Sequence, residues 1–362
     1  MTKLTAGSSP TRTERFHEID LLRALACLMV VAFHYLYRGA LDGWSPVAEP
    51  SGLGDFARYG YLGVHLFFII SGFVIFLSVR NATVRDFFAS RVSRLYPAYW
   101  VAVPLTWAVV CFFNLPDLTV SWQHMLVNLT MVPHWFKVPY VDGAYWSLGV
   151  ELQFYILVGV ALKFDLNRRA DWLLAAWLLV ALVNGVRPMY PVEFWLAANW
   201  APLFAIGALA YRMRSLGVNR WRVALMAGAY LLAIWYGIKP VLAPKPGQEA
   251  SQDPWIVAIL LSLFVFVFIL IATGRFKIKR HALFYWAGLL TYPVYLMHEY
   301  IGYAFLSLLE SKSIGFAVSV MLVFGGVVLM AWALNRWVER PLAPRLRAAL
   351  SAKNPVRIST AG

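Results

Sequence analysis

The sequence predicts an all-α integral membrane protein, a bundle of about ten transmembrane helices whose N- and C-termini are both cytoplasmic. Three observations support this fold class: an apolar composition, apolar runs that recur along the chain, and an uneven distribution of Lys and Arg. Of the 362 residues, 60% are hydrophobic and only 14% are charged, which is unlike an ordinary soluble domain. A run of about twenty apolar residues is long enough to cross a bilayer as a helix.

The apolar runs define the ten expected helices. They cover roughly residues 19–38, 59–79, 97–115, 146–163, 171–187, 193–211, 221–239, 254–273, 282–308 and 314–336. The ninth is long for one span, and Pro293 is expected to bend it. We therefore expect one transmembrane domain over 17–345, between disordered cytoplasmic tails over 1–16 and 346–362.

Lys and Arg concentrate in alternate loops. If the N-terminus is cytoplasmic, 24 of the 32 Lys and Arg residues lie on the cytoplasmic side and 7 on the opposite side, and Arg23 lies within the first helix. This asymmetry follows the positive-inside rule. It also explains most of the net charge of +14 by topology and contact with membrane lipids, so no nucleic-acid partner is expected. The two cysteines form no C-x-x-C pair, and no metal site is expected.

The first expected helix carries two polar side chains at positions that hydrocarbon would otherwise surround. Arg23 and His34 are eleven residues apart, which puts them within about 20° on one face and roughly 16 Å apart along the axis. Charged or titratable groups inside a spanning helix are costly in free energy and usually face a protein cavity. Both residues are therefore functional candidates. A snorkelling Arg and a buried, hydrogen-bonded His are the structural alternative.

A pair of arginines precedes the third expected helix. Arg91 and Arg94 are three residues apart on an expected helical turn, so both guanidinium groups can reach one anion. Phosphate groups would suit such a pair. A positively charged cytoplasmic loop is the alternative explanation. Pro97 is expected to open the third helix, a position that proline tolerates.

The fourth expected helix carries a carboxylate, Glu151, flanked by Ser147 and Tyr155 on the same face. If Trp146 marks the outer end of this helix, Glu151 lies about 7 Å inside it, and His34 lies about 6 Å from the outer end of the first helix. At equal depth the two can pair, and the carboxylate would fix the tautomer of the imidazole and stabilise its charged form. A structural ion pair is the competing explanation.

Polar side chains also occur in the second and ninth expected helices. The Ser71-Gly72 pair is expected to allow close helix approach or a local kink. Ser71 is not expected to be a nucleophile, because no G-x-S-x-G motif surrounds it. His65 fits a packing role and a functional role equally well. Tyr295 and His298 are i, i+3 neighbours near mid-span. We take His65, Ser147, Tyr155, Tyr295 and His298 as candidate substrate-binding residues.

Six motifs, in this order, resemble those of the membrane-bound acyltransferase 3 family. They are Arg23-x10-His34, LFFIISGF at 66–73, RVSRLYP at 91–97, WSLGVELQFY at 146–155, TYPVYLMH at 291–298 and ERP at 339–341. The family includes bacterial O-acetyltransferases of surface polysaccharides such as the O-antigen of lipopolysaccharide. Many relatives have an acidic residue where this chain has His65.

The resemblance implies a multi-pass O-acyltransferase, and O-acetyltransferase as the first expectation, in the bacterial inner (cytoplasmic) membrane. The expected donor is cytoplasmic acyl-CoA, in the first instance acetyl-CoA, and the expected acceptor is a hydroxyl of an extracytoplasmic glycan or glycolipid. Arg91, Arg94 and Arg23 would bind the coenzyme, and His34, Glu151 and Arg23 would be catalytic. His34 would act as a general base or would first take the acyl group itself.

Two other function classes fit a helical membrane protein with buried charges. A transporter or flippase of a polysaccharide precursor or small molecule would show inverted repeats and broken helices in both halves, and we find no such symmetry in the sequence. A membrane scaffold or sensor without turnover would pair Arg23, His34 and Glu151 with one another and would have no cavity between them.

Overall fold

The computed structural model describes residues 16–45, 53–79, 82–243, 252–279 and 281–351. Within these ranges all regular elements are helices, without a strand, and eight helical segments are long and apolar enough to cross a membrane. Two shorter apolar helices cover Ala170–Val186 and Ala282–Met297. The protein is thus a helical, multi-pass membrane protein, whereas the count of ten spans and the cytoplasmic position of the termini stay predictions.

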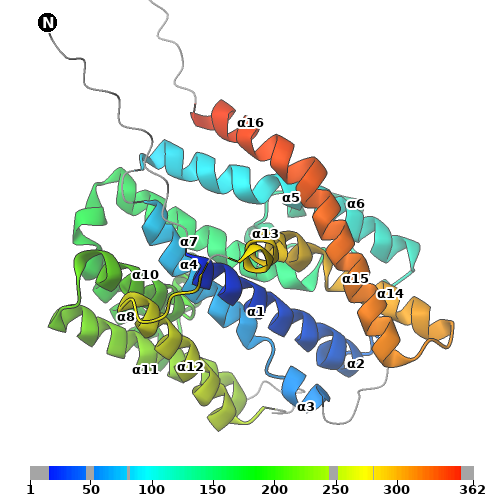
Figure 1. The fold of residues 1–362 in the computed structure, drawn as a ribbon, viewed down its shortest axis with the longest axis horizontal. Coiled ribbons are helices and arrows are strands. Elements are labelled where there is room, and N and C mark those ends of the chain that lie inside the picture. The colour runs from blue at the N-terminus through cyan, green and yellow to red at the C-terminus, as the bar shows by residue number, and fades with distance from the viewer. Residues whose placement is uncertain (1–15, 46–52, 80–81, 244–251, 280, 352–362) are drawn as a thin grey trace, which may run out of the picture.

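The helices are short and long in irregular alternation. In chain order they are α1 (His17–Phe33), the π-helix η1 (His34–Arg38), α2 (Gly39–Leu41), α3 (Leu53–Ala57), α4 (Leu62–Ser78), α5 (Val84–Phe112), η2 (Pro116–Leu118), α6 (Trp122–Asn128), η3 (Pro133–Phe136), η4 (Gly143–Tyr145), α7 (Trp146–Lys163), η5 (Leu166–Arg169), α8 (Ala170–Val186), α9 (Tyr190–Leu196), α10 (Ala201–Leu216), α11 (Arg220–Leu242), α12 (Pro254–Ala272), α13 (Ala282–Met297), α14 (Tyr300–Ser311), α15 (Phe316–Leu334), η6 (Asn335–Glu339) and α16 (Arg340–Ser351). In Figure 1, α1 lies near the middle of the molecule, between the group α10–α12 and the group α14–α16.

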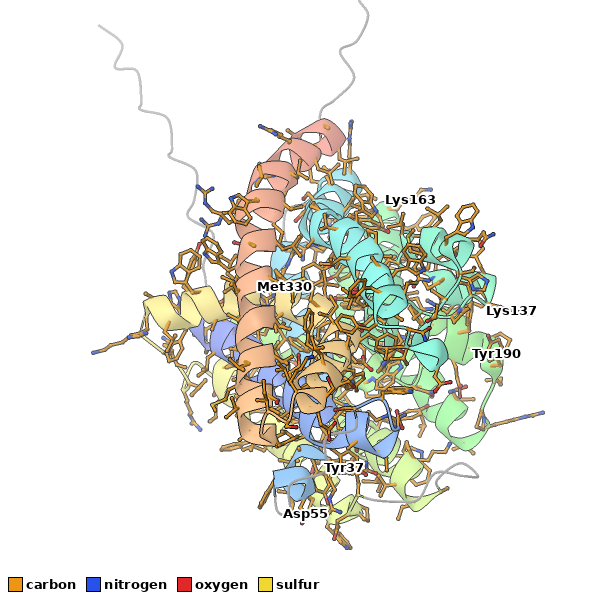
Figure 2. The ribbon with its side chains drawn as sticks, turned by 90° about the vertical axis from the view of Figure 1, so that its right-hand side faces the viewer. Tyr37, Asp55, Lys137, Lys163, Tyr190 and Met330 are labelled. Carbon is orange, nitrogen blue, oxygen red and sulfur yellow. The ribbon has the colours of Figure 1, made fainter. Side chains whose placement is uncertain are left out.

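The two ends of the molecule are marked by labelled residues in Figure 2. Tyr37 and Asp55 lie at one end, which we call the Tyr37 end, and Lys163 lies at the other, which we call the Lys163 end. Since Tyr37 lies in η1, which directly continues α1, and Lys163 is the last residue of α7, α1 runs toward the Tyr37 end and α7 toward the Lys163 end. His34 is accordingly nearer the Tyr37 end than Arg23.

Helices α4 and α10 pack backbone to backbone through glycines. A Cβ atom on Gly72 would clash with the carbonyl oxygen of Phe204, and one on Gly207 would clash with the carbonyl oxygen of Ile69. Such contacts are available only to glycine, so the predicted close packing at Gly72 is confirmed. The contact fixes the position of α4, which presents Ser71 and His65 to neighbouring helices.

Helix α5 begins at Val84, well before the predicted start at residue 97. Thr83 caps it: the Thr83 hydroxyl oxygen accepts from the backbone N–H of Asp86 at 3.1 Å. Pro97 therefore lies inside the helix, and the prediction that it opens the helix is wrong. The consequence is that Arg91 and Arg94 sit on a continuous helix and not in a loop.

The ninth predicted helix is two helices. The break lies at His298 and Glu299, between α13 and α14, whereas Pro293 stays inside α13. The interruption therefore lies beyond Pro293, and the bend expected at Pro293 stays a prediction. A broken helix leaves backbone and side-chain groups free to form a polar site in the interior of a membrane protein.

The C-terminal helix is longer than predicted. α15, η6 and α16 form one uninterrupted helical segment of 36 residues, Phe316–Ser351, seen as a long rod in Figure 2. Residues 346–351, expected in a disordered tail, are thus helical. Phe16, expected in the N-terminal tail, is buried against Phe73. The remainder of both expected tails, 1–15 and 352–362, lies outside the described residues.

The segment before α7 folds into the interior. Asp142 and Tyr145 have no exposed surface and Ala144 is 3% exposed. Helix α7 consequently starts inside the bundle. Trp146 is therefore not at an outer end of the helix, although the depth estimate from the sequence placed it there. This changes the depth at which Glu151 lies.

Candidate active site

A polar cavity opens between α1, α4, α5, α7 and α13. It has an empty volume of about 730 Å³. Its polar lining residues are Arg23, Ser71, Arg91, Arg94, Ser147, Glu151, Tyr155, Thr291, Tyr292 and Tyr295. We call it the arginine cavity. Three guanidinium groups and one carboxylate give its lining a net charge of +2, which favours an anionic ligand.

The arginines differ in exposure. Arg91 is 8% exposed, and its Nη2 donates to the Ser90 hydroxyl at 2.9 Å. Its Nε and Nη1 atoms are buried and have no hydrogen-bond partner among the described residues. Arg94 is exposed, and Nη1 of Arg23 lies 3.9 Å from Oδ1 of Asp20. A buried guanidinium group with unused N–H donors beside a cavity can bind an oxyanion such as phosphate.

Glu151 belongs to this cavity. Its Oε1 accepts hydrogen bonds from the hydroxyls of Ser71 and Tyr155, both at 2.6 Å. Ser71 is therefore part of the site, whereas the sequence predicted only a packing role for it. Glu151 was predicted to pair with His34 because the two residues were expected at equal depth. In the structure its carboxylate instead bonds to Ser71 and Tyr155. The reason is that α7 begins inside the bundle, so that Glu151 lies with the arginines.

His34 lies in a second polar group, at the residue where α1 changes from α-helix to π-helix. Its Nδ1 is 3.0 Å from Nε2 of His298 and 3.0 Å from the carbonyl oxygen of Val30. Its Nε2 is 3.5 Å from Oε2 of Glu299. Glu299 in turn shares a hydrogen bond with Asp142. We call His34, His298, Glu299 and Asp142 the histidine cluster.

The hydrogen bonds fix the tautomers of both histidines. Nδ1 of His298 is 2.8 Å from the carbonyl oxygen of Tyr295, and a carbonyl only accepts, so Nδ1 of His298 carries the proton. In a neutral imidazole its Nε2 then accepts, and His34 must donate to it from Nδ1. This leaves Nε2 of His34 unprotonated, as a base requires.

The two carboxyl groups of the cluster share one proton. Two carboxylates in hydrogen-bond contact cannot both be ionised in a buried site. Asp142 accepts from the backbone N–H groups of Ala144 at 3.0 Å and Tyr300 at 3.1 Å, which favours the charge on Asp142 and the proton on Glu299. Burial raises the pKa of both carboxyl groups above their ordinary values. The pair thus supplies one negative charge beside His34, which would balance an imidazolium.

Tyr295 stands between the two groups. Its side chain lines the arginine cavity and its hydroxyl is 2.6 Å from the Ser147 hydroxyl. Its carbonyl oxygen belongs to the hydrogen-bond chain through His298 to His34. Among the described residues the cavity lining includes Tyr295 and not His34, so the arginine cavity ends short of His34.

Comparison with known proteins assigns the chain to a family. A family model described as "Acyltransferase domain" (Acyl_transf_3) matches residues 16–336. The chain belongs to the membrane-bound acyltransferase 3 family. The resemblance drawn from six motifs is thereby confirmed. No solved structure matches the chain significantly.

Relatives in this acyltransferase family carry related activities in their names. The chain is 26% identical to acyltransferase MdmB of Streptomyces mycarofaciens over 65% of this chain and 66% of that protein. It is 26% identical to the exopolysaccharide production protein ExoZ of Rhizobium meliloti over 82% of this chain and 93% of that protein. It is 23% identical to the peptidoglycan O-acetyltransferase OatA of Listeria monocytogenes over 69% of this chain, but only 39% of that protein.

The candidate residues named from the sequence divide among three places in this acyltransferase fold. Arg23, Arg91, Arg94, Ser147, Glu151, Tyr155 and Tyr295 line the arginine cavity, His34 and His298 belong to the histidine cluster, and His65 lines a different cavity. Their chemical roles stay predictions.

Five residues of the site were missed by sequence reasoning: Ser71, Thr291 and Tyr292 in the arginine cavity, and Asp142 and Glu299 in the histidine cluster. A signal existed for Glu299. A carboxylate within an apolar stretch of a membrane protein is a functional candidate by default, and Glu299 directly follows His298.

Proposed function

We propose that this chain is an integral membrane O-acyltransferase that moves an acyl group from cytoplasmic acyl-CoA, in the first instance acetyl-CoA, to a hydroxyl of an extracytoplasmic glycan or glycolipid. The observation that carries the proposal is the pairing of a cationic cavity with a histidine whose Nε2 is a free base, near Tyr295 in one bundle. Family membership supports the acyl transfer, and the relatives ExoZ and OatA support a polysaccharide acceptor.

The donor would bind in the arginine cavity. Its phosphate groups are the anions that Arg91, Arg94 and Arg23 suit, and the unpaired nitrogens of Arg91 support an oxyanion close to this side chain. The pantetheine arm would extend along α1 toward the Tyr37 end. The separation of Arg23 and His34, roughly 16 Å along the helix axis, is comparable to the reach of that arm. Movement of the Tyr295 side chain would open the path by which the thioester reaches His34.

The acceptor hydroxyl would lose its proton to Nε2 of His34 while its oxygen attacks the thioester carbonyl. The C–S bond then breaks, and the thiolate of the coenzyme takes the proton back from the imidazolium, so that the products are an ester and free coenzyme A. The shared charge of Glu299 and Asp142 would stabilise the imidazolium. A route through an acyl-histidine uses the same Nε2 atom and stays open.

The test is transfer from radiolabelled acetyl-CoA by the purified protein in nanodiscs, with alkali-deacetylated surface glycan of the source cells as acceptor. We expect His34→Ala to lower kcat by roughly 10² to 10⁴, the range of general-base catalysis, without loss of the folded protein. Mass spectrometry of surface glycans from cells with and without the gene identifies the ester formed. Full transfer by a folded His34→Ala protein would falsify the assignment of His34.

A further inference from the structure

A second polar cavity lies between α4, α9, α10 and α11. It has an empty volume of about 1090 Å³. Its polar and aromatic lining residues are His65, Glu193, Asn199, Trp200, Tyr236 and Lys239. We call it the tryptophan cavity. One carboxylate and one ammonium group leave its lining without net charge, in contrast to the arginine cavity.

The polar groups of this cavity are held in place by hydrogen bonds to α8. Asn184, which is 1% exposed, donates to Oε1 of Glu193 at 3.2 Å and to Oδ1 of Asn199 at 3.0 Å. The Tyr236 hydroxyl donates to the carbonyl oxygen of Ala181 at 2.7 Å, and Nζ of Lys239 donates to that of Gly185 at 3.3 Å. The donors and acceptors are thus arranged before a ligand arrives, which lowers the entropy loss on binding.

Trp200 forms part of an aromatic wall between the two cavities. Its ring centroid lies 5.2 Å from that of Phe68 and 5.1 Å from that of Trp146. Phe68 lines the arginine cavity on the other side. Only the thickness of these rings therefore separates the neutral cavity from the cationic one.

A chain of ring contacts also connects the tryptophan cavity to His34. The ring of His65 contacts that of Tyr61 at 5.8 Å, and Tyr61 contacts Phe33, the neighbour of His34, at 5.8 Å. The start of α4 therefore lies beside the end of α1, and His65 lies toward the Tyr37 end, as His34 does.

We propose that the tryptophan cavity is the acceptor subsite and takes one neutral, hydroxyl-rich sugar ring of the glycan. The C–H face of the sugar packs on the indole of Trp200, and its hydroxyls bond to Glu193, Asn199, Tyr236 and Lys239. A neutral lining with fixed donors and acceptors suits a sugar better than a phosphate or an acyl chain. The inference rests on the proposed function, because it names the substrate of the same reaction.

The experiment separates acceptor binding from donor binding. Glu193→Gln keeps the shape of the side chain and removes its charge, and Trp200→Ala removes the indole. Each is assayed in nanodiscs with acetyl-CoA and alkali-deacetylated surface glycan fragments. We expect the KM for the glycan to rise roughly tenfold or more, the effect of losing one strong polar contact, with the KM for acetyl-CoA within twofold of wild type.

Controls make both outcomes decisive. Trp255→Ala, at a Trp that is 78% exposed, is the matched control and should leave both KM values unchanged. An unchanged KM for the glycan in the folded Glu193→Gln protein overturns the inference, even if Trp200→Ala fails to fold. If the wild-type protein transfers no acetyl group to any glycan fraction, the proposed function itself fails, which is a different result.

Discussion

The hydrogen bonds of the His34 imidazole lie at Nδ1, on the side away from Nε2, the nitrogen that would act as the base in the proposed reaction. The carbonyl oxygen of Tyr295 fixes the tautomer of His298, and His298 fixes that of His34. These hydrogen bonds do not have to rearrange when Nε2 of His34 accepts a proton. In the proposed reaction, the one negative charge shared by Glu299, 3.5 Å from this nitrogen, and Asp142 would balance the new charge.

The two buried carboxylates of the site should differ in their kinetic effect. We expect Glu299→Gln to lower kcat by roughly tenfold to a hundredfold with little change in the KM for acetyl-CoA, because an amide, unlike a carboxyl group, cannot pass its proton to Asp142 and so bring the shared negative charge beside the imidazolium. Glu151→Gln should instead change the KM for acetyl-CoA, because Glu151 lines the arginine cavity. Steady-state kinetics of the two isosteric variants check this. The opposite assignment of the two effects would restore Glu151 as the partner of His34.

The arginine cavity should recognise the phosphate groups of the donor. We expect Arg91→Ala to raise the KM for acetyl-CoA by roughly tenfold to a hundredfold, because charge-assisted bonds to phosphate are lost. Acetyl-pantetheine, which lacks the nucleotide and its phosphates, should react equally well with the variant and the wild type. Arg85→Ala, on the same helix but exposed and outside the cavity, is the control. An equal loss with both donors would show that Arg91 does not bind phosphate.

At the scale of the helices, the sequence was sufficient where a property depends on residues close together in the chain. Apolar runs located the long helices, and spacing on a helical turn brought Arg91 and Arg94 to one cavity. The partner of His34 depends on contacts between distant segments. Asp142 bonds to the backbone of Tyr300, 158 residues away, and this draws the start of α7 into the bundle. No periodicity within α7 indicates this depth.

The glycine contact between α4 and α10 gives a prediction about stability. Gly207→Ala places a Cβ against the backbone of α4, and we expect it to destabilise the protein by about 1–3 kcal/mol, the usual effect of overpacking. Gly228→Ala, in the interior of α11 with nothing within 4 Å of the added Cβ, should stabilise by up to about 1 kcal/mol through helix propensity. Thermal unfolding in detergent compares them. Equal Tm values for the two variants would contradict the close backbone packing of α4 against α10.

At the scale of the whole molecule, the polar groups are ordered along the bundle. Arg23 precedes His34 on α1, which runs toward the Tyr37 end, and α7 carries Glu151 and runs toward the Lys163 end. The neutral tryptophan cavity and the cationic arginine cavity meet at the wall of Phe68, Trp146 and Trp200. An enzyme with this order can join a donor from one side to an acceptor from the other without transporting the coenzyme.

This order is productive only if the Lys163 end faces the cytoplasm, as the positive-inside distribution predicts. In a background of Cys27→Ala and Cys111→Ser, we expect Lys163→Cys to react with a membrane-impermeant maleimide only in inside-out vesicles, and Asp55→Cys only in right-side-out vesicles. Both positions are labelled in Figure 2 at opposite ends of the molecule. Transfer to an external glycan in right-side-out vesicles should then require acetyl-CoA in the lumen. The reverse labelling would place the arginine cavity outside, where cytoplasmic acyl-CoA cannot reach it.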